Sequence, residues 1–122
     1  ILGNKALPIV EIITGDNFYD YDAKYNSSST QYITPASLDY EIEKQVYADA
    51  IKLYRIMGCE NYARVDYRLD SACDHKLLEI NTLPGLTPTS IFPKSASAAG
   101  LEYDELLSTL IELGTYKYAN NI

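Results

Sequence analysis

The sequence predicts an α+β fold in which an antiparallel β-sheet is flanked by helices. This prediction rests on one long segment with apolar residues at helical spacing, two short segments in which apolar and polar residues alternate, and an amphipathic helical segment near the C-terminal end. The chain has 122 residues, enough for one hydrophobic core and too few for two ordinary domains. We therefore expect a single compact unit.

The composition is that of a globular protein without a nucleic-acid surface. Hydrophobic residues make up 47% of the chain, charged residues make up 22%, and the formal net charge is -7. Nucleic-acid surfaces need clustered Lys and Arg, and the sequence has no such cluster. It has no apolar run near the roughly 18 residues of a membrane span and no signal-peptide pattern, so we expect a cytoplasmic protein with no membrane partner.

Cysteine and histidine are too few to build a zinc site. Cys59 and Cys73 are the only cysteines, and His75 is the only histidine. A zinc site needs about four such ligands, so these three cannot form one alone. We expect both cysteines to be ordinary structural thiols. The chain also opens without Met and almost inside a strand, which favours a piece of a longer polypeptide.

The first expected element is a strand at residues 8–14, PIVEIIT, because this run is continuous and rich in β-branched residues. Residues 15–36 are polar and rich in tyrosine, and no regular pattern runs through them. Irregular segments of this length in compact domains are usually functional lids or disordered linkers. The density of aromatic residues favours a mobile lid, because linkers contain few of them.

Two helices and one helical turn are expected in the rest of the chain. Ser37 is the expected N-cap of a long helix that ends at Gly58, with apolar positions at Leu38, Ile42, Val46, Ala50, Leu53 and Met57. A helical turn is expected at residues 94–99. A final amphipathic helix is expected at residues 101–113, with Gly114 as its stop and an apolar face formed by Leu106, Leu110 and Leu113.

The two alternating segments, residues 62–69 and 76–81, are expected to pair as an antiparallel hairpin across the turn formers DSACDH. One face of the first strand carries Ala63, Val65, Tyr67 and Leu69, and the other carries Tyr62, Arg64, Asp66 and Arg68. In the second strand, Leu78 and Ile80 are expected on one face, and Leu77, Glu79 and Asn81 on the other.

This register brings Asp66, Glu79 and Asn81 together on one face. Two carboxylates and an amide oxygen are hard ligands, which suit Mg²⁺. Arg64 would add a permanent positive charge next to an anion held by the metal. The alternative is a solvated hairpin face whose exposed ion pairs contribute about 0–1 kcal/mol each.

The sequence around the hairpin favours the metal site. RVD begins at Arg64, twelve residues separate it from EIN, and TLPGLTPTS follows directly, while FYDYDAKY stands earlier in the chain and AAGLEYDELL later. In this order and spacing the motifs resemble the C-terminal region of D-alanine:D-alanine ligases of the ATP-grasp superfamily. The resemblance implies that residues 1–122 form a C-terminal ATP-grasp subdomain with a long mobile loop, and that the N-terminal and central domains lie outside this sequence.

The resemblance implies ATP-dependent ligation of two D-alanines to D-alanyl-D-alanine, a step in peptidoglycan precursor synthesis. ATP phosphorylates the carboxylate of the first D-alanine, and the amine of the second attacks the acyl phosphate. The implied cofactors are ATP and two Mg²⁺ ions, with Mn²⁺ as an alternative. The full-length enzyme is expected to be a homodimer, and this chain alone is expected to be inactive.

The resemblance assigns the polar residues of the hairpin and one glycine. Asp66, Glu79 and Asn81 match the metal-binding positions, with Glu79 as the bridge between the ions. Arg64 matches the arginine that stabilises the acyl phosphate and the tetrahedral intermediate. Gly85 matches the position whose backbone N–H contributes to the oxyanion hole, although the residue pattern alone would favour a simple turn glycine.

The resemblance also assigns residues of the two loops. Ser90 matches the serine that receives the carboxylate of the second D-alanine. Lys24 matches a lysine that contacts the terminal phosphate, and Tyr25 matches a tyrosine that closes over the substrates and favours an amine acceptor. Phe18 and Leu78 match part of an apolar slot for adenine.

Two residues depart from the family pattern: Arg68 stands where an apolar residue near the base is usual, and Pro88 where a small polar or flexible residue is usual. Two other functions stay open. One is a different ATP-grasp carboxylate-amine ligase, and the other is a noncatalytic module that binds Mg²⁺ or a nucleotide.

Overall fold

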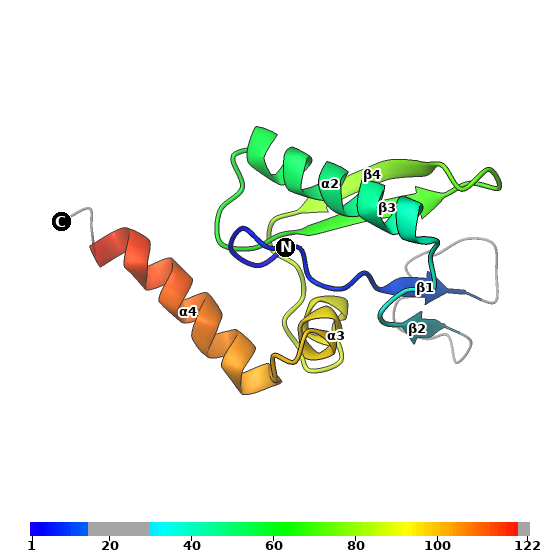
Figure 1. The fold of residues 1–122 in the computed structure, drawn as a ribbon. Coiled ribbons are helices and arrows are strands. Elements are labelled where there is room, and N and C mark those ends of the chain that lie inside the picture. Colours follow the sequence, from blue (N-terminus) through cyan, green and yellow to red (C-terminus); the bar gives the residue numbers. More distant parts are fainter. Residues whose placement is uncertain (15–29, 120–122) are drawn as a thin grey trace.

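The computed structural model describes residues 1–14 and 30–119, which form an α+β fold (Figure 1). The elements in chain order are β1 (Glu11–Ile13), β2 (Gln31–Ile33), α2 (Tyr40–Ile56), β3 (Arg64–Leu69), β4 (His75–Asn81), α3 (Ile91–Ala98) and α4 (Tyr103–Ala119). The strands form two antiparallel pairs, β1 with β2 and β3 with β4. The predicted fold class is confirmed. None of the helices in the described ranges is both long and apolar enough to cross a membrane.

The smaller sheet shows that part of the expected lid is regular. Ile12 of β1 lies opposite Tyr32 of β2, and the N–H of Ala36 donates to the carbonyl of Ile9 at 2.9 Å. The prediction of an irregular segment over residues 15–36 was therefore wrong at residues 31–33, because Gln-Tyr-Ile pairs with the β-branched residues of β1. Residues 15–29 of the predicted lid lie outside the described residues.

The long helix is confirmed, but its N-cap is Asp39 and not Ser37. The N–H of Ser37 instead donates to the carboxylate of Glu11 at 3.4 Å, so Ser37 belongs to the segment that connects β2 to the helix. Gly58 ends the helix as predicted, with a φ of 64°. The N–H of Gly58 bonds to the carbonyl of Arg55 and that of Cys59 to the carbonyl of Tyr54, the pattern of a Schellman motif.

The predicted hairpin is confirmed, and it contains a β-bulge. Asp66 lies opposite Glu79 and Tyr67 lies opposite Leu77, so the register shifts by one residue and Leu78 is the extra residue of β4. Opposed residues of an antiparallel pair share a face. Leu77 therefore shares the face of Tyr67, and the prediction that Leu77 and Glu79 lie on one face was wrong.

The core consists of two groups of buried side chains. The hairpin cluster joins α2 to β3 and contains Ile1, Ala50, Tyr54 and Ala63. The helical cluster joins α3 to α4 and contains Phe92, Ala96 and Leu106. Both clusters include residues of the same pair of extended segments. In this pair Ile1 exchanges two backbone hydrogen bonds with Ala63, and Leu2 forms an isolated β-bridge with Tyr62. Neighbouring residues of an extended chain face opposite ways, so these two pairs serve different clusters.

The two C-terminal helices differ from their predicted bounds. α3 begins at Ile91, three residues before the predicted turn at residues 94–99. α4 continues through Gly114 to Ala119, so the prediction that Gly114 stops the helix was wrong. An interior glycine costs a helix only about 0.5–1 kcal/mol relative to alanine, which is too little to end it. Figure 1 shows that the N-terminal end of α4 lies near α3 and that α4 then extends away from the rest of the fold.

Candidate active site

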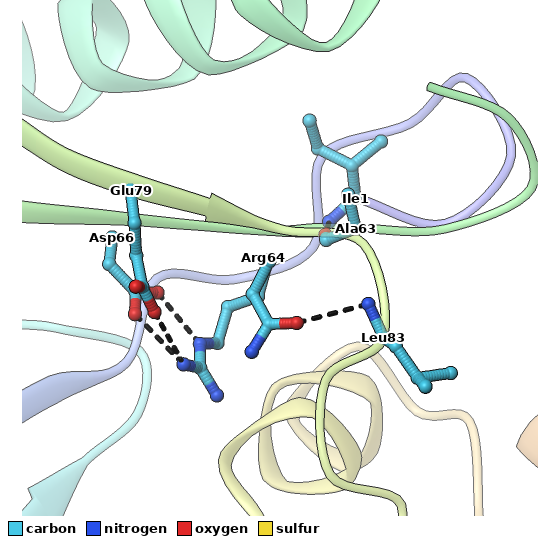
Figure 2. A network of polar contacts seen from close by, with 7 residues as sticks. Ile1, Ala63, Arg64, Asp66, Glu79 and Leu83 are labelled. Atoms are coloured by element: carbon cyan, nitrogen blue, oxygen red, sulfur yellow. Dashed lines mark hydrogen bonds and ion pairs between the residues drawn. The ribbon is translucent and has the colours of Figure 1, made fainter.

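The face of the hairpin opposite α2 carries a pair of carboxylates. Asp66 of β3 and Glu79 of β4 are directly opposed in the ladder, as the sequence predicted. Figure 2 shows Asp66, Glu79 and Arg64 extending from the strands to this side. The exposed fractions of the Asp66 and Glu79 side chains are 28% and 57%, so a ligand can reach both carboxylates.

Arg64 links the two carboxylates. Its Nε donates to Asp66 Oδ1 at 2.7 Å, and its Nη2 donates to Asp66 Oδ2 at 2.9 Å, which makes a two-point contact. The same Nη2 lies 3.6 Å from Glu79 Oε1 (Figure 2). One positive charge therefore separates two negative charges, and the three groups together carry a net charge of -1. The planar guanidinium group suits this geometry because it offers parallel donors to a carboxylate.

Asn81 lies opposite Arg64 in the ladder, at the end of β4. Its Oδ1 accepts a hydrogen bond from the N–H of Leu83 at 3.0 Å, which fixes how the chain leaves the sheet. The amide oxygen has a second lone pair, so this turn does not prevent it from binding a cation. The structure thus brings Arg64, Asp66, Glu79 and Asn81 together on one face.

The oxygen atoms on this face fit Mg²⁺ better than zinc. Within residues 1–14 and 30–119, no group of three or more His, Cys, Asp and Glu side chains is arranged to hold a metal ion. Asp66, Glu79 and Asn81 supply only two carboxylates and one amide. Mg²⁺ commonly binds through one or two carboxylates and completes its shell with water and substrate phosphates. The donor set therefore fits Mg²⁺ shared with a phosphorylated substrate.

The opposite face of the hairpin is fixed to α2. His75 Nε2 of β4 lies 2.7 Å from Asp49 Oδ2 of α2, and the His75 ring packs edge-on against Tyr67 at 5.3 Å between centroids. Burial first, and then the charge of Asp49, raise the pKa of Tyr67 to about 12. The carboxylate pair is thus carried by strands whose other face is packed, which favours a fixed geometry.

Gly85 and Ser90 meet in the loop that follows β4. A Cβ atom placed on Gly85 would lie 2.9 Å from Ser90 Oγ, closer than real Cβ contacts allow. Ser90 is the N-cap residue of α3, but its side chain makes no capping hydrogen bond. Its Oγ accepts instead from the N–H of Thr87 at 3.2 Å. The absence of a side chain at Gly85 therefore leaves room for the Ser90 hydroxyl group.

Four predicted site residues remain, and the structure describes one of them, Leu78. Leu78 is the extra residue at the bulge and is 64% exposed, so it is open to a ligand and does not belong to the core. Phe18, Lys24 and Tyr25 lie outside the described residues, and their assignments stay predictions.

Sequence reasoning missed two residues near this site, Thr87 in the loop before α3 and Lys94 within α3. Thr87 Oγ1 lies 2.7 Å from Ser90 Oγ, and the spacing of the two residues, three apart before a helix, was a signal for this contact. Lys94 Nζ donates to the carbonyl of Thr89 and lies 5.3 Å from the centroid of the Tyr32 ring. The contact with Tyr32 joins α3 to β2, and no local sequence pattern predicts it.

Comparisons with known proteins agree with these motifs. The family described as "D-ala D-ala ligase C-terminus" matches residues 1–112. The D-alanine--D-alanine ligase of Vesicomyosocius okutanii is 43% identical over 111 residues, which cover 91% of this chain and 38% of that protein. That of Haemophilus influenzae is 39% identical over 113 residues, with 93% and 38% covered. The chain thus spans less than half the length of these relatives.

Solved structures resemble the fold over nearly the whole chain. The D-alanine--D-alanine ligase of Bacillus anthracis complexed with ATP is 36% identical with a TM-score of 0.81, and the match covers 100% of this chain and 40% of that one. The VanG D-Ala:D-Ser ligase of Enterococcus faecalis is 32% identical with a TM-score of 0.73, and the match covers 92% and 34%. In both cases this chain matches only part of the longer solved chain.

Proposed function

The chain belongs to the D-ala D-ala ligase C-terminal family, and from this premise we propose that the whole protein joins two D-alanines at the expense of ATP. In this proposal residues 1–122 are the C-terminal ATP-grasp domain, and the product is D-alanyl-D-alanine for peptidoglycan precursor synthesis. The observation that carries the proposal is the opposed pair Asp66 and Glu79 with Arg64 in contact with both.

The carboxylate face would hold Mg²⁺ between the protein and the phosphates of ATP. Asp66, Glu79 and Asn81 would be the protein ligands, with Glu79 shared between two ions. The ions, or Mn²⁺ in their place, would neutralise phosphate charge during phosphoryl transfer. Glu79 suits the shared position because it is the more exposed of the two carboxylates and its contact with Arg64 is the longer one.

Arg64 would stabilise the acyl phosphate and the tetrahedral intermediate. It already contacts both carboxylates, so it stands beside the place where phosphate charge would accumulate. Guanidinium binds phosphate oxygens by parallel hydrogen bonds, as it binds Asp66 here. The N–H of Gly85 would donate to the developing oxyanion, and Ser90 would receive the carboxylate of the acceptor.

Three further assignments come with the family. Lys24 would contact the terminal phosphate, Tyr25 would close over the substrates, and Phe18 with the exposed Leu78 would contact adenine. A closing segment would protect the acyl phosphate from water. We place the whole protein in the cytoplasm as a homodimer, with D-alanine and ATP as its small-molecule substrates.

Glu79→Gln in the full-length protein tests the proposal. The change keeps the shape of the side chain and removes one negative charge from the candidate metal site. We expect ligation of D-alanine to be abolished while the circular dichroism spectrum and the Tm stay near those of the wild type, because Glu79 lies on a solvated face. Phosphate release and dipeptide formation are measured together over a range of Mg²⁺ concentrations.

Glu112→Gln is the matched control, because Glu112 is an exposed carboxylate on α4. It should leave the rate unchanged. Near wild-type turnover of Glu79→Gln at limiting Mg²⁺ would contradict the metal assignment. The same assay with D-serine and D-lactate tests the choice of acceptor, since the chain also resembles a D-Ala:D-Ser ligase.

A further inference from the structure

The hydroxyl group of Ser90 is held by Thr87 and not by the helix that Ser90 caps. Thr87 makes two contacts with Ser90 Oγ, one from its N–H at 3.2 Å and one from its Oγ1 at 2.7 Å. The N–H of Ser90 donates in return to the carbonyl of Thr87 at 2.9 Å. Ser90 makes no capping bond to the first N–H groups of α3, so its orientation depends on Thr87.

Gly85 leaves the room that the Ser90 hydroxyl group occupies. A Cβ atom on Gly85 would lie 2.9 Å from Ser90 Oγ and 3.5 Å from Ser90 Cβ. The hydroxyl group therefore contacts Thr87 and occupies space that a side chain at Gly85 would need. A rotation of Ser90 away from Thr87 would lose both contacts to Thr87.

The direction of the bond between the two hydroxyl groups is open when no ligand is bound, since either oxygen can be the donor. A hydroxyl group has one hydrogen and two acceptor lone pairs. If Ser90 gives its hydrogen to an anion, it can only accept from Thr87, so Thr87 becomes the donor. The N–H and the hydroxyl group of Thr87 then both donate to Ser90 Oγ, and Ser90 donates to the anion.

We propose that Thr87 is a positioning residue that directs the hydroxyl hydrogen of Ser90 toward the carboxylate of the acceptor amino acid. This rests on the proposed function, in which Ser90 receives that carboxylate. Donation by Thr87 polarises the Ser90 hydroxyl group and strengthens its bond to the anion. Thr87 acts only through Ser90, so its loss weakens acceptor binding and leaves ATP binding unchanged.

The test compares four substitutions in the full-length protein. Thr87→Val removes the hydroxyl group and keeps the shape of the side chain, Thr87→Ser keeps the hydroxyl group, and Thr115→Val is the control at an exposed threonine of α4. Initial rates are measured against D-alanine at saturating ATP and fitted for the donor and acceptor sites, and the KM for ATP is measured separately. Thr87 is exposed, and Thr87→Ala provides a second variant that lacks the hydroxyl group.

We expect Thr87→Val and Thr87→Ala to raise the KM for the acceptor D-alanine roughly five- to tenfold, the size typical of one lost hydrogen bond. The kcat and the KM for ATP should change little, and Thr87→Ser should restore the acceptor KM. An unchanged acceptor KM, a parallel rise in the KM for ATP, or no rescue by serine would overturn the inference. A wild-type protein that forms no dipeptide would instead overturn the proposed function, and this inference with it.

Discussion

At the scale of single residues, Arg64 organises the candidate site. Its guanidinium group contacts both carboxylates, and its two-point contact with Asp66 depends on the separate Nε and Nη2 donors. A lysine carries the same charge but offers it as a point, without the planar fork. The geometry of the guanidinium group, and not its charge alone, should therefore matter for the chemistry.

We predict that Arg64→Lys in the full-length protein lowers kcat about 100-fold or more, the usual loss when one donor to a developing negative charge is removed. The fold should survive, because lysine keeps a positive charge next to the Asp66 and Glu79 carboxylates. Steady-state kinetics and a thermal melt check the two parts. A kcat near that of the wild type would show that the charge alone is sufficient.

Tyr67 gives a second residue-scale prediction, on the packed face of the hairpin. Its buried hydroxyl oxygen is without a hydrogen-bond partner in the described part of the chain, and its pKa is raised from 10.0 to about 12. Because the pKa is higher in the folded state, ionisation of Tyr67 does not lower the free energy of unfolding below pH 10. The free energy of unfolding falls as the pH rises from 10 toward 12. Tyr67→Phe should remove that pH dependence and cost little at pH 7, since it deletes an unsatisfied group.

Urea unfolding of this 122-residue chain and of Tyr67→Phe at pH 7 and at pH 11 measures the effect. The difference in the free energy of unfolding should move in favour of the variant at the higher pH. Comparing the variants cancels the titration of the other tyrosines. A difference that is the same at both pH values would contradict the assigned shift.

At the scale of elements, sequence patterns predicted the long regular segments and missed short or tertiary features. The 3.6-residue period located α2 to within a few residues, and the two-residue period paired Asp66 with Glu79. The bulge was hidden because Leu77 and Leu78 are identical, so alternation could not show which of them is extra. β2 is only three residues long and depends on β1 for its hydrogen bonds.

The candidate site divides in the same way. The carboxylate face could be predicted from the strand register and the family motifs. The contact between the Thr87 and Ser90 hydroxyl groups depends in addition on the conformation of the loop. Gly114 was predicted to be a stop because glycine often follows a helix, yet α4 continues through it to Ala119.

Gly114 leads to the prediction at this scale. A Cβ atom added at Gly114 would meet nothing within 4 Å, so alanine fits without rearrangement. We expect Gly114→Ala to stabilise α4 by about 0.5–1 kcal/mol, because alanine loses less backbone entropy in a helix. Chemical denaturation measures the change, and Gly58→Ala is the opposite control, since φ is 64° there and a side chain is strained. A destabilised Gly114→Ala would mean that helix continuation at this residue depends on glycine.

At the scale of the whole molecule, the core is divided between the hairpin cluster and the helical cluster. They meet at the paired segments of Ile1 with Ala63 and Leu2 with Tyr62. The carboxylate pair lies on the hairpin that the first cluster holds, and the loop of Gly85 and Ser90 leads into the helix that the second cluster holds. The two halves of the candidate site therefore depend on different groups of buried side chains.

We predict that Leu106→Ala loosens α3 and α4 more than α2 and the hairpin. Leu106 is fully buried, and removing such a side chain typically costs about 2–5 kcal/mol. Hydrogen exchange followed by mass spectrometry should show faster exchange mainly in residues 91–119. Ala50→Gly, in the hairpin cluster, should give the reverse pattern. Equal acceleration in both regions would mean that the two clusters unfold as one cooperative unit.

The bulge at Leu78 also determines where this domain can accept new sequence. It separates the hairpin into a turn-side ladder, from Tyr67 with Leu77 to Leu69 with His75, and a site-side ladder that contains Asp66 and Glu79. A slip of one residue normally moves every side chain of a strand to the opposite face. Here an irregularity already lies between the two ladders, so a slip that begins at the exposed turn of residues 70–74 can be absorbed at Leu78. A peptide tag or a fluorescent reporter inserted between Ser71 and Ala72 would therefore lengthen the tip of the hairpin while the carboxylates stay aligned.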